Sequence, residues 1–221
     1  MLFKKGAEGN LHLEPFKRVL QIPGDGKVMV KWRIPKQYRV EELDMRLRSS
    51  RTALEAKLLS DAKRAGVPTP AVYEINLIDS RIVMEFIKGK QVKIVLEGLK
   101  SVARVRLCRK IGRHVARLHR AGILHGDLTT SNMLLKTNGM VYFVDFGLGE
   151  YNPSVEGRGV DLHLLKRSFQ SIHFRIAEQA YRAVLAGYRR ELGEGAKETI
   201  KRANDIEKRG RYISKEERAW H

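Results

Sequence analysis

The feature that most constrains this chain is a pair of polar motifs on either side of two short apolar runs. HGDLTTSN begins at His125, and the runs NMLLK and MVYFVDF then lead into a DFG tripeptide that begins at Asp145. Asn138 and Gly139 lie between the runs and are typical of a tight turn. The pattern predicts two short strands joined by a turn, with a polar loop at each end.

The residue types in these loops are those that phosphoryl transfer requires. Asp127 and Asn132 have the spacing of the kinase catalytic loop, H-x-D-x-x-x-x-N, whose aspartate orients the attacking oxygen. Asp145 follows a predicted strand, as a metal-binding carboxylate should. Alone, an aspartate beside glycine is more often a turn residue. The order of the motifs, each beside a strand, favours a site for ATP and its metal ions.

Such a site also needs a lysine on a strand and a glutamate on a helix to pair with it. Lys31 ends VMVK, which is the third predicted strand. Glu55 lies in TALEAKLL, within a long helical pattern, and its position suits the pairing role. The competing residues are Lys27 and Lys36 for the lysine, and Glu41 and Glu42 for the glutamate.

The hydrophobic period changes along the chain. Residues 1–33 are expected to form short strands, and AVYEINLI and SRIVMEFI two more, around one helix from Glu41 to Ala65. Beyond them the pattern is mostly helical, through about residue 208. This predicts an α+β, reduced bilobal fold with a strand-rich N-lobe over residues 1–87 and a mainly helical C-lobe over residues 88–221.

The charge of the chain is strongly one-sided. It has 43 Lys and Arg against 25 Asp and Glu, a formal net charge of +18. Residues 101–120, SVARVRLCRKIGRHVARLHR, contain seven basic residues and no acid. A solvated helix face usually mixes both signs, so this face and the basic last fifty residues favour a nucleic acid or another polyanion as partner. The opposite face carries an apolar stripe: Val102, Val105, Cys108, Ile111, Val115 and Leu118.

Several classes of protein are disfavoured by composition. The single Cys108 excludes an intramolecular disulfide framework. The N-terminus MLFKKGAEGNLHLE lacks the apolar core of a signal peptide, and no run approaches the roughly 18 apolar residues of a membrane span. We therefore expect a soluble, cytoplasmic protein.

Four segments together carry a family resemblance. VMVKWRIPKQYR, HGDLTTSN, DFGL and GVDLHLLKR closely resemble the small kinase-like subunits of the KEOPS complex in their archaeal, single-domain form, and the likeness spans nearly the whole chain. It implies a reduced protein-kinase fold that binds ATP and Mg²⁺, an atypical serine/threonine kinase that acts as an ATPase, and a role in threonylcarbamoyladenosine modification of tRNA. The implied partners are the threonylcarbamoyl-transfer subunit, a small activating subunit, and tRNA bound through the basic C-lobe and tail.

The resemblance also implies residue roles. Asp127 would be the catalytic base. Asn132 and Asp145 would be the metal ligands, and Lys31, paired with Glu55, would contact the phosphates. The other implied residues are Gly6, Ala7, Glu8 and Gly9 over the phosphates, Met84, Glu85 and Ile87 beside adenine, and Asp161 as a brace for the catalytic loop.

Departures from ordinary protein kinases narrow the activity. KGAEGN is not G-x-G-x-x-G and brings Glu8 near the phosphates. Gly126 stands where many kinases have an arginine that reads a phosphorylated activation loop, and Thr129 where they have a lysine. Only 16 positions separate Asp145 from Asp161. We therefore expect slow ATP hydrolysis, with autophosphorylation as a side reaction, rather than broad protein phosphorylation.

Three alternatives remain open from the sequence. Small-molecule kinases of the aminoglycoside or choline type also use an HGD loop, but they carry a larger substrate insert. RIO-type ribosome-assembly kinases are close in mechanism. A nucleotide-gated RNA-binding scaffold with no turnover would keep the basic surface and need no catalysis.

Overall fold

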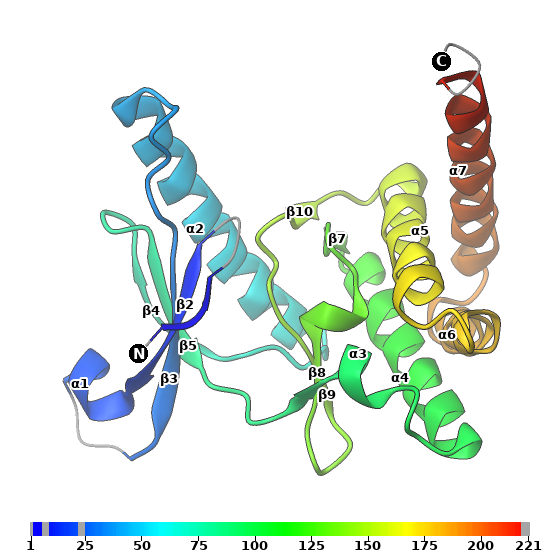
Figure 1. Ribbon diagram of the computed structural model, residues 1–221, viewed down its shortest axis with the longest axis horizontal. Coiled ribbons are helices and arrows are strands. Elements are labelled where there is room, and N and C mark those ends of the chain that lie inside the picture. The colour runs from blue at the N-terminus through cyan, green and yellow to red at the C-terminus, as the bar shows by residue number, and fades with distance from the viewer. Residues whose placement is uncertain (1, 6–8, 22–24, 218–221) are drawn as a thin grey trace.

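The N-lobe is built on a five-stranded antiparallel sheet, in a computed structural model that describes residues 2–5, 9–21 and 25–217 (Figure 1). The spatial order is β1-β2-β3-β5-β4. In the middle strand, β3, Val28 and Val30 face one side of the sheet, whereas Met29 packs against the main core on the other. The strands are β1 (Leu2–Lys5), β2 (Asn10–Pro15), β3 (Lys27–Trp32), β4 (Val72–Asn76) and β5 (Arg81–Glu85).

A short helix, α1 (Phe16–Leu20), covers the outer face of this sheet. The sequence analysis predicted short strands throughout residues 1–33, and this segment is a correction. Phe16, Val19 and Leu20 pack against the small cluster formed by Val28, Val30 and Val83. The helix thus supplies the outer face of β3 and β5 with an apolar cover, and this long-range packing overrides the local pattern.

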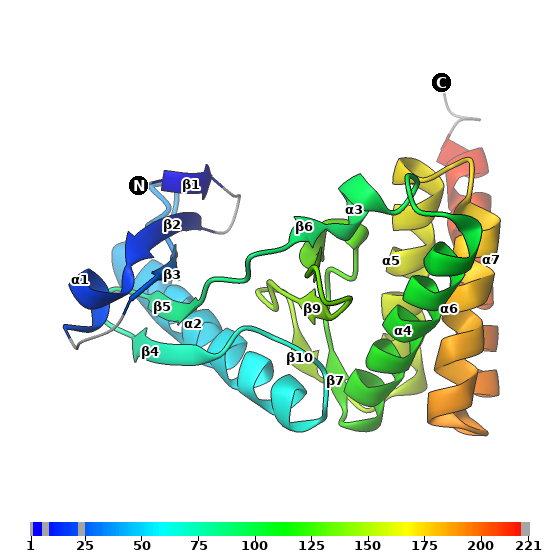
Figure 2. The ribbon, with the colours of Figure 1, turned by 90° about the horizontal axis from the view of Figure 1, so that it is seen from below.

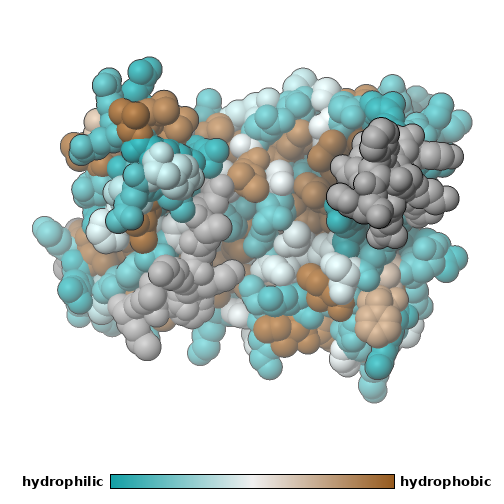
Figure 3. Space-filling model, turned by 45° about the horizontal axis from the view of Figure 1, so that its top comes forward, coloured by the Kyte–Doolittle hydropathy of each residue, from teal (hydrophilic) through white to brown (hydrophobic). Residues whose placement is uncertain are grey.

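The long helix α2 (Glu41–Arg64) was predicted within one residue and runs from the outer end of the N-lobe toward the C-lobe (Figures 1 and 2). Only its second half enters the core, where Leu58, Leu59 and Ala62 are fully buried. Leu43 and Met45 in the first half are exposed, and apolar residues gather over this outer end of the helix (Figure 3, upper left). Glu55 lies on the buried half, close to the other lobe.

The C-lobe is mainly helical, as predicted. Its large buried side chains include Phe143, Phe146, Phe169 and Tyr188. None of the helices among the described residues combines the length and apolar character that a membrane span requires. Its elements are β6 (Lys90–Gln91), α3 (Val92–Val95), α4 (Ser101–Arg120), β7 (Ile123–Leu124), the 3₁₀ turn η1 (Thr130–Asn132), β8 (Met133–Leu135), β9 (Val141–Phe143), β10 (Glu150–Tyr151), α5 (Val155–Ile172), α6 (Ala177–Leu192) and α7 (Gly195–Glu217).

Helices α4 and α6 pack unusually close to one another (Figure 2). A Cβ atom at Gly112 would lie 1.9 Å from the Val184 carbonyl oxygen, and one at Gly187 would lie 2.0 Å from that of Arg109. Only glycine permits this approach, because neither carbonyl can move without shifting a helix. Of the predicted apolar stripe on α4, Cys108 and the residues after it are buried, but Val102 is 64% exposed and lies outside the core.

Candidate active site

Three segments that are distant in the sequence meet at Lys31. Its ammonium Nζ donates hydrogen bonds to Glu55 Oε1 and to Asp145 Oδ1, each at 2.6 Å. Lys31 comes from β3, Glu55 from the buried half of α2, and Asp145 from the loop after β9. Of the glutamates considered from sequence, Glu55 is the one that the structure brings to this lysine. Lys31 and Glu55 are buried, whereas half of the Asp145 side chain is exposed.

The charges in this cluster hold one another ionised. Burial alone would lower the pKa of Lys31, but the carboxylates of Glu55 and Asp145 outweigh it and raise that pKa above its ordinary value. Burial would likewise raise the pKa of Asp145, but the Lys31 ammonium lowers it instead. Lys31 is therefore a cation and Asp145 an anion at neutral pH, which suits contact with phosphate and with a metal ion, respectively.

A second buried cation, Arg33, was missed by the sequence analysis. Its guanidinium Nη2 donates to Glu55 Oε2 at 2.7 Å, so each carboxylate oxygen of Glu55 has its own cation. Arg33 follows Lys31 by two residues, and alternation along the strand directs both side chains to the same face. That spacing was a signal in the sequence. Glu55 therefore has a cationic partner besides Lys31.

Residues of the catalytic-loop motif are also hydrogen-bonded to one another. The Asn132 amide Nδ2 donates to Asp127 Oδ2 at 2.8 Å and to the Asp127 carbonyl oxygen at 3.0 Å. The Val144 N–H donates to the Asn132 carbonyl oxygen at 3.0 Å and ties this loop to the segment that carries Asp145. Since its nitrogen is engaged with Asp127, the amide oxygen of Asn132 is the atom left for a metal ion.

Asp161 braces the loop from α5, as the resemblance implied. Its carboxylate accepts the backbone N–H groups of His125 at 2.7 Å and Gly126 at 2.9 Å. Burial would raise the pKa of Asp161, but hydrogen bonding and charge from His119 and the contacts at His125 lower it. The His125 ring packs on Phe146 of DFG, with ring centroids 4.5 Å apart. The brace fixes the backbone that presents Asp127.

Comparisons with known proteins agree with this geometry. The RIO domain family matches residues 32–149, which is more than half of the chain. The chain is 46% identical to "KEOPS complex subunit Bud32" of Pyrococcus abyssi, over 99% of this chain and 98% of that protein. The chain belongs to the Bud32 family. The chain thus matches both a RIO domain and a KEOPS subunit, so these two interpretations do not exclude each other. The α+β kinase-like fold is confirmed.

Two further relatives show that similar sequences occur both as a separate protein and as part of a longer one. "Probable serine/threonine-protein kinase BUD32 homolog" of Archaeoglobus fulgidus is 47% identical over 85% of this chain and 90% of that protein. "Probable bifunctional tRNA threonylcarbamoyladenosine biosynthesis protein" of Methanobrevibacter smithii is 42% identical over 96% of this chain. The match covers only 36% of that bifunctional protein. The Bud32 chain therefore corresponds to one part of a longer relative.

The local backbone geometry requires a glycine at position 126. Its φ is +77°, and a Cβ atom there would lie 2.0 Å from the Leu148 carbonyl oxygen. A side chain at this position would have to displace the backbone of the segment that follows DFG. The local packing therefore leaves no room for the arginine that many kinases have at this position.

The short segment after DFG is fastened to the N-lobe helix. The Tyr151 hydroxyl donates to Asp61 Oδ2 on α2, and the Lys57 ammonium lies 5.2 Å from the centre of the Tyr151 ring. On its other side the segment pairs with the C-lobe, as Glu150 and Tyr151 form β10 beside β7. Since α2 also carries Glu55, this contact links the position of the glutamate to the segment after Asp145.

The predicted phosphate cover is described only in part. Gly6, Ala7 and Glu8 lie outside the described residues. Gly9 is described, and a Cβ atom there would lie 2.6 Å from the Trp32 carbonyl oxygen. In this structure its lack of a side chain serves close packing on β3.

The structure limits which backbone group Glu85 can offer at the predicted hinge. Met84 and Ile87, beside it, are buried, at 7% and 5% exposed. The Glu85 N–H, however, donates to the Ala71 carbonyl oxygen at 2.8 Å. It is therefore not available to adenine, and Glu85 has only its carbonyl group to offer.

The donor set fits Mg²⁺ carried with a nucleotide. Among the described residues, no three His, Cys, Asp or Glu side chains are grouped as a metal cage. Mg²⁺ is usually held by one or two carboxylates together with substrate phosphates rather than by a protein cage. Asp145, with the Asn132 amide oxygen beside it, supplies that smaller set. Use of ATP and Mg²⁺ is general in the kinase-like family to which the chain belongs.

Proposed function

We propose that this chain is the ATP-hydrolysing kinase-like subunit of a KEOPS complex and supports threonylcarbamoyladenosine formation in tRNA. One observation carries the proposal: Lys31 bonds both Glu55 and Asp145 at 2.6 Å. The Asp127–Asn132 pair of the catalytic loop is tied by the Val144 N–H to the segment that carries Asp145. The names of the relatives supply the complex and the tRNA modification. The two lobes are taken as residues 1–87 and 88–221.

The residues have separate tasks in this proposal. Asp145 and the Asn132 amide oxygen hold Mg²⁺, which neutralises phosphate charge when it is bound with ATP. Lys31, held by Glu55, contacts the phosphates. Asp127 accepts a hydrogen bond from a water molecule and orients it toward the γ-phosphate. The remaining contacts, to adenine and the phosphates, come from Met84, the Glu85 carbonyl, Ile87, Gly9 and the segment Gly6, Ala7 and Glu8.

Hydrolysis is favoured over phosphorylation of proteins because little of the chain can receive a peptide. The segment from Asp145 to Asp161 is short, and Tyr151 fastens it to α2. Thr129 provides no cation beside a transferred phosphate. A water molecule requires no platform, so ATP is turned over slowly, with autophosphorylation as a side reaction. The partners proposed are the threonylcarbamoyl-transfer subunit, a small activating subunit and tRNA, in the cytoplasm.

The test is ATP hydrolysis by the pure protein with Mg²⁺, with and without tRNA and the transfer subunit. Asp127→Ala and Asp145→Ala are each expected to lower the rate by about 10³-fold or more, since each removes a group that positions water or metal. Asp79→Ala, in the exposed β4–β5 turn, is the matched control and should leave the rate unchanged.

The alternatives predict different outcomes. Stimulation by tRNA and the transfer subunit supports the proposal, whereas stimulation by aminoglycosides or choline would instead indicate a small-molecule kinase. ATP binding without turnover under every condition would indicate a nucleotide-gated RNA-binding scaffold. A high rate of peptide phosphorylation by the isolated chain would contradict the proposed preference for water.

A further inference from the structure

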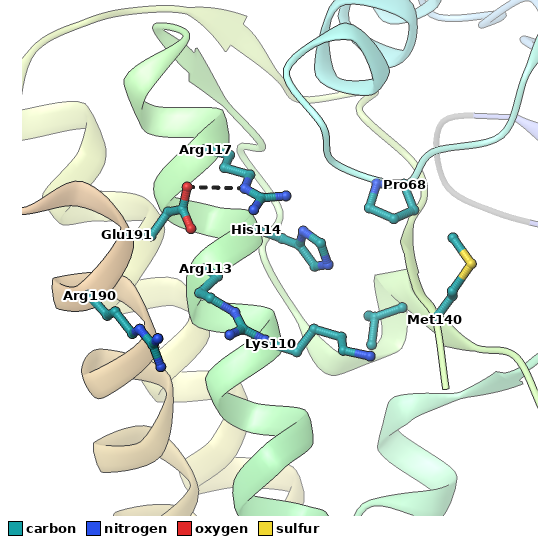
Figure 4. A pocket seen from close by; sticks show the side chains of 9 residues that line it. Pro68, Lys110, Arg113, His114, Arg117, Met140, Arg190 and Glu191 are labelled. Carbon is teal, nitrogen blue, oxygen red and sulfur yellow. Dashed lines mark hydrogen bonds and ion pairs between the residues drawn. The ribbon is translucent and has the colours of Figure 1, made fainter. Parts of the chain in front are cut away.

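A basic hollow lies on the C-lobe where the second half of α4 and the last turn of α6 meet the loop at Pro68 and the start of β9 (Figure 4). Its volume is about 440 Å³. It shares no residue with the Lys31 cluster or the catalytic loop. We call it the α4–α6 pocket; its charged and titratable lining residues are Lys110, Arg113, His114, Arg117, Arg190 and Glu191.

The cations of this pocket outnumber its carboxylates four to one. Glu191 is already engaged, since Arg117 Nε donates to it at 3.1 Å and Arg120 contacts it as well. Arg113 and Arg190 have no ion pair within the part of the chain that is described. Their guanidinium groups therefore bring uncompensated positive charge to the pocket, with several free N–H donors each.

His114 adds an unfilled hydrogen-bonding atom. The side chain is buried, at 9% exposed, and its Nδ1 atom has no hydrogen-bond partner among the described residues. The ring stands edge-on to Phe143 and lines the hollow on the side of Pro68 (Figure 4). A buried polar atom without a partner is uncommon and costs free energy unless a ligand or water satisfies it. The pocket thus has both charge and a hydrogen-bonding position to offer a ligand.

The pocket's cations on α4 lie in a line that Arg106 extends beyond the pocket. Arg106, Lys110, Arg113 and Arg117 recur every three or four residues and so lie on one face of α4. With a rise of about 1.5 Å per residue, they span about 16 Å. A single small anion would occupy only part of this line. Its length, together with the apolar side chains of Pro68 and Met140 at the pocket, suits a polymer of phosphates and sugars.

We propose that the α4–α6 pocket binds phosphate groups of an RNA backbone. The inference rests on the proposed function for the choice of tRNA as the RNA, but not for the pocket itself. Arg113 and Arg190 contact the phosphate oxygens, because guanidinium N–H groups match phosphate geometry. His114 completes the site through its free ring nitrogen.

The first experiment measures binding of an unmodified tRNA transcript at several salt concentrations. Arg113→Ala/Arg190→Ala is expected to weaken binding by about 100-fold, at about tenfold for each charged hydrogen-bonding contact. The slope of log affinity against log salt should fall by about two, since two phosphate contacts are lost. Thermal melting of each variant shows whether it is folded.

The matched control removes two cations at the other end of the molecule. Lys17→Ala/Arg18→Ala in α1 loses the same charge from exposed side chains, whose ion pairs are with Asp25 and Glu14. It should change the affinity much less. Equal losses in the two double variants would overturn the proposal, because they would show that general charge, not the pocket, attracts tRNA. Unchanged tRNA binding together with weaker binding of the transfer subunit would also overturn the proposal. That result would indicate that the pocket binds a protein partner.

The second experiment follows the pKa of His114 by NMR. Burial first, then the charges of Arg117, Lys110 and Arg113, lower this pKa to about 4, while Glu191 opposes them. A bound phosphate should raise it by its negative charge. An unchanged pKa with saturating tRNA would contradict the proposal, as would a pKa that responds to inorganic phosphate but not to tRNA. ATP hydrolysis by the unaltered chain without RNA tests the proposed function separately, since it does not require the pocket.

Discussion

The proposed active site around Lys31 and the α4–α6 pocket both gather cations, but these cations differ in their partners. At the proposed active site, Lys31 hydrogen-bonds two carboxylates and Arg33 hydrogen-bonds the second oxygen of Glu55. In the pocket, Arg113 and Arg190 have no ion pair among the described residues, and Glu191 is already shared by other arginines. The net charge of +18 is therefore distributed unevenly over the fold.

This difference fits the two kinds of phosphate recognition proposed above, one for each site. A cation held by carboxylates is fixed in position, which is what catalysis on one small anion needs. Cations without carboxylate partners, such as Arg113 and Arg190, add affinity for a polyanion and make that affinity dependent on salt. The contrast can be tested by damaging each region separately.

The largest effect is expected at Lys31 in the proposed active site. Lys31→Ala should lower ATP hydrolysis by about 10²–10³-fold, since it removes the cation that meets the phosphates and holds Asp145. Lys27→Ala, at the exposed start of the same strand, is the control and should have little effect. The measurement is steady-state hydrolysis with saturating Mg²⁺. Equal rates for wild type and Lys31→Ala would remove this lysine from the proposed site.

Breaking the α4–α6 contact should come next. Gly112→Ala is expected to lower the free energy of unfolding by about 3 kcal/mol or more, because the new Cβ atom would meet the Val184 carbonyl at 1.9 Å. Gly195→Ala has no atom within 4 Å of its Cβ position and should be neutral or slightly stabilising. Urea unfolding of both variants checks this. A neutral Gly112→Ala would mean that the helices can separate easily.

A smaller effect is expected from His114 as pH changes. Its folded pKa of about 4 lies below the unfolded value, so the unfolded chain binds more protons in between, and stability is lost as pH falls from about 6.5 to 4. Burial sets this pKa first, and Arg117, Lys110 and Arg113 on its own helix lower it further, with Glu191 opposing them. His114→Gln cannot titrate and should lose about 3 kcal/mol less over that range. Parallel losses in both proteins would contradict this assignment.

The smallest effect is expected from the contact between Tyr151 and Asp61 on α2. Tyr151→Phe removes the hydrogen bond to Asp61 and should cost about 0.5–1 kcal/mol of stability, because both groups are near the surface. ATP hydrolysis should fall by only a few-fold, through looser positioning of α2 and Glu55. Tyr73→Phe, on exposed β4, serves as the control for loss of a hydroxyl. A large loss of activity would show that this contact governs the catalytic cluster.

The sequence predicted the two-lobed fold and the meeting of Lys31 with Glu55. Those predictions succeeded because fixed motif spacings and hydrophobic periods report directly on strands, loops and helices. Arg33 was missed, although its i, i+2 spacing from Lys31 was visible, because no motif names it. The hydrogen bond that engages the Glu85 N–H depends on the distant Ala71 and could not be read locally.

The rest depends on contacts between elements far apart in the sequence. α1 is helical because it covers the outer sheet, and Val102 is exposed because the core ends before the first turn of α4. The pocket could not be located from sequence, since it requires the close crossing at Gly112 and Gly187. Only the basic character of the helix was predicted, not the point at which its charges lack partners.

The contact between Gly126 and Leu148 has a consequence for how such a protein can evolve. Acquiring a switch controlled by phosphorylation would require an arginine at position 126, yet no single substitution there is compatible with the neighbouring backbone. A descendant would first have to rebuild the segment after DFG, whose Tyr151 contacts Asp61 on the helix that carries Glu55. Control through binding partners needs no change at this crowded position, so single substitutions on an exposed surface could alter it.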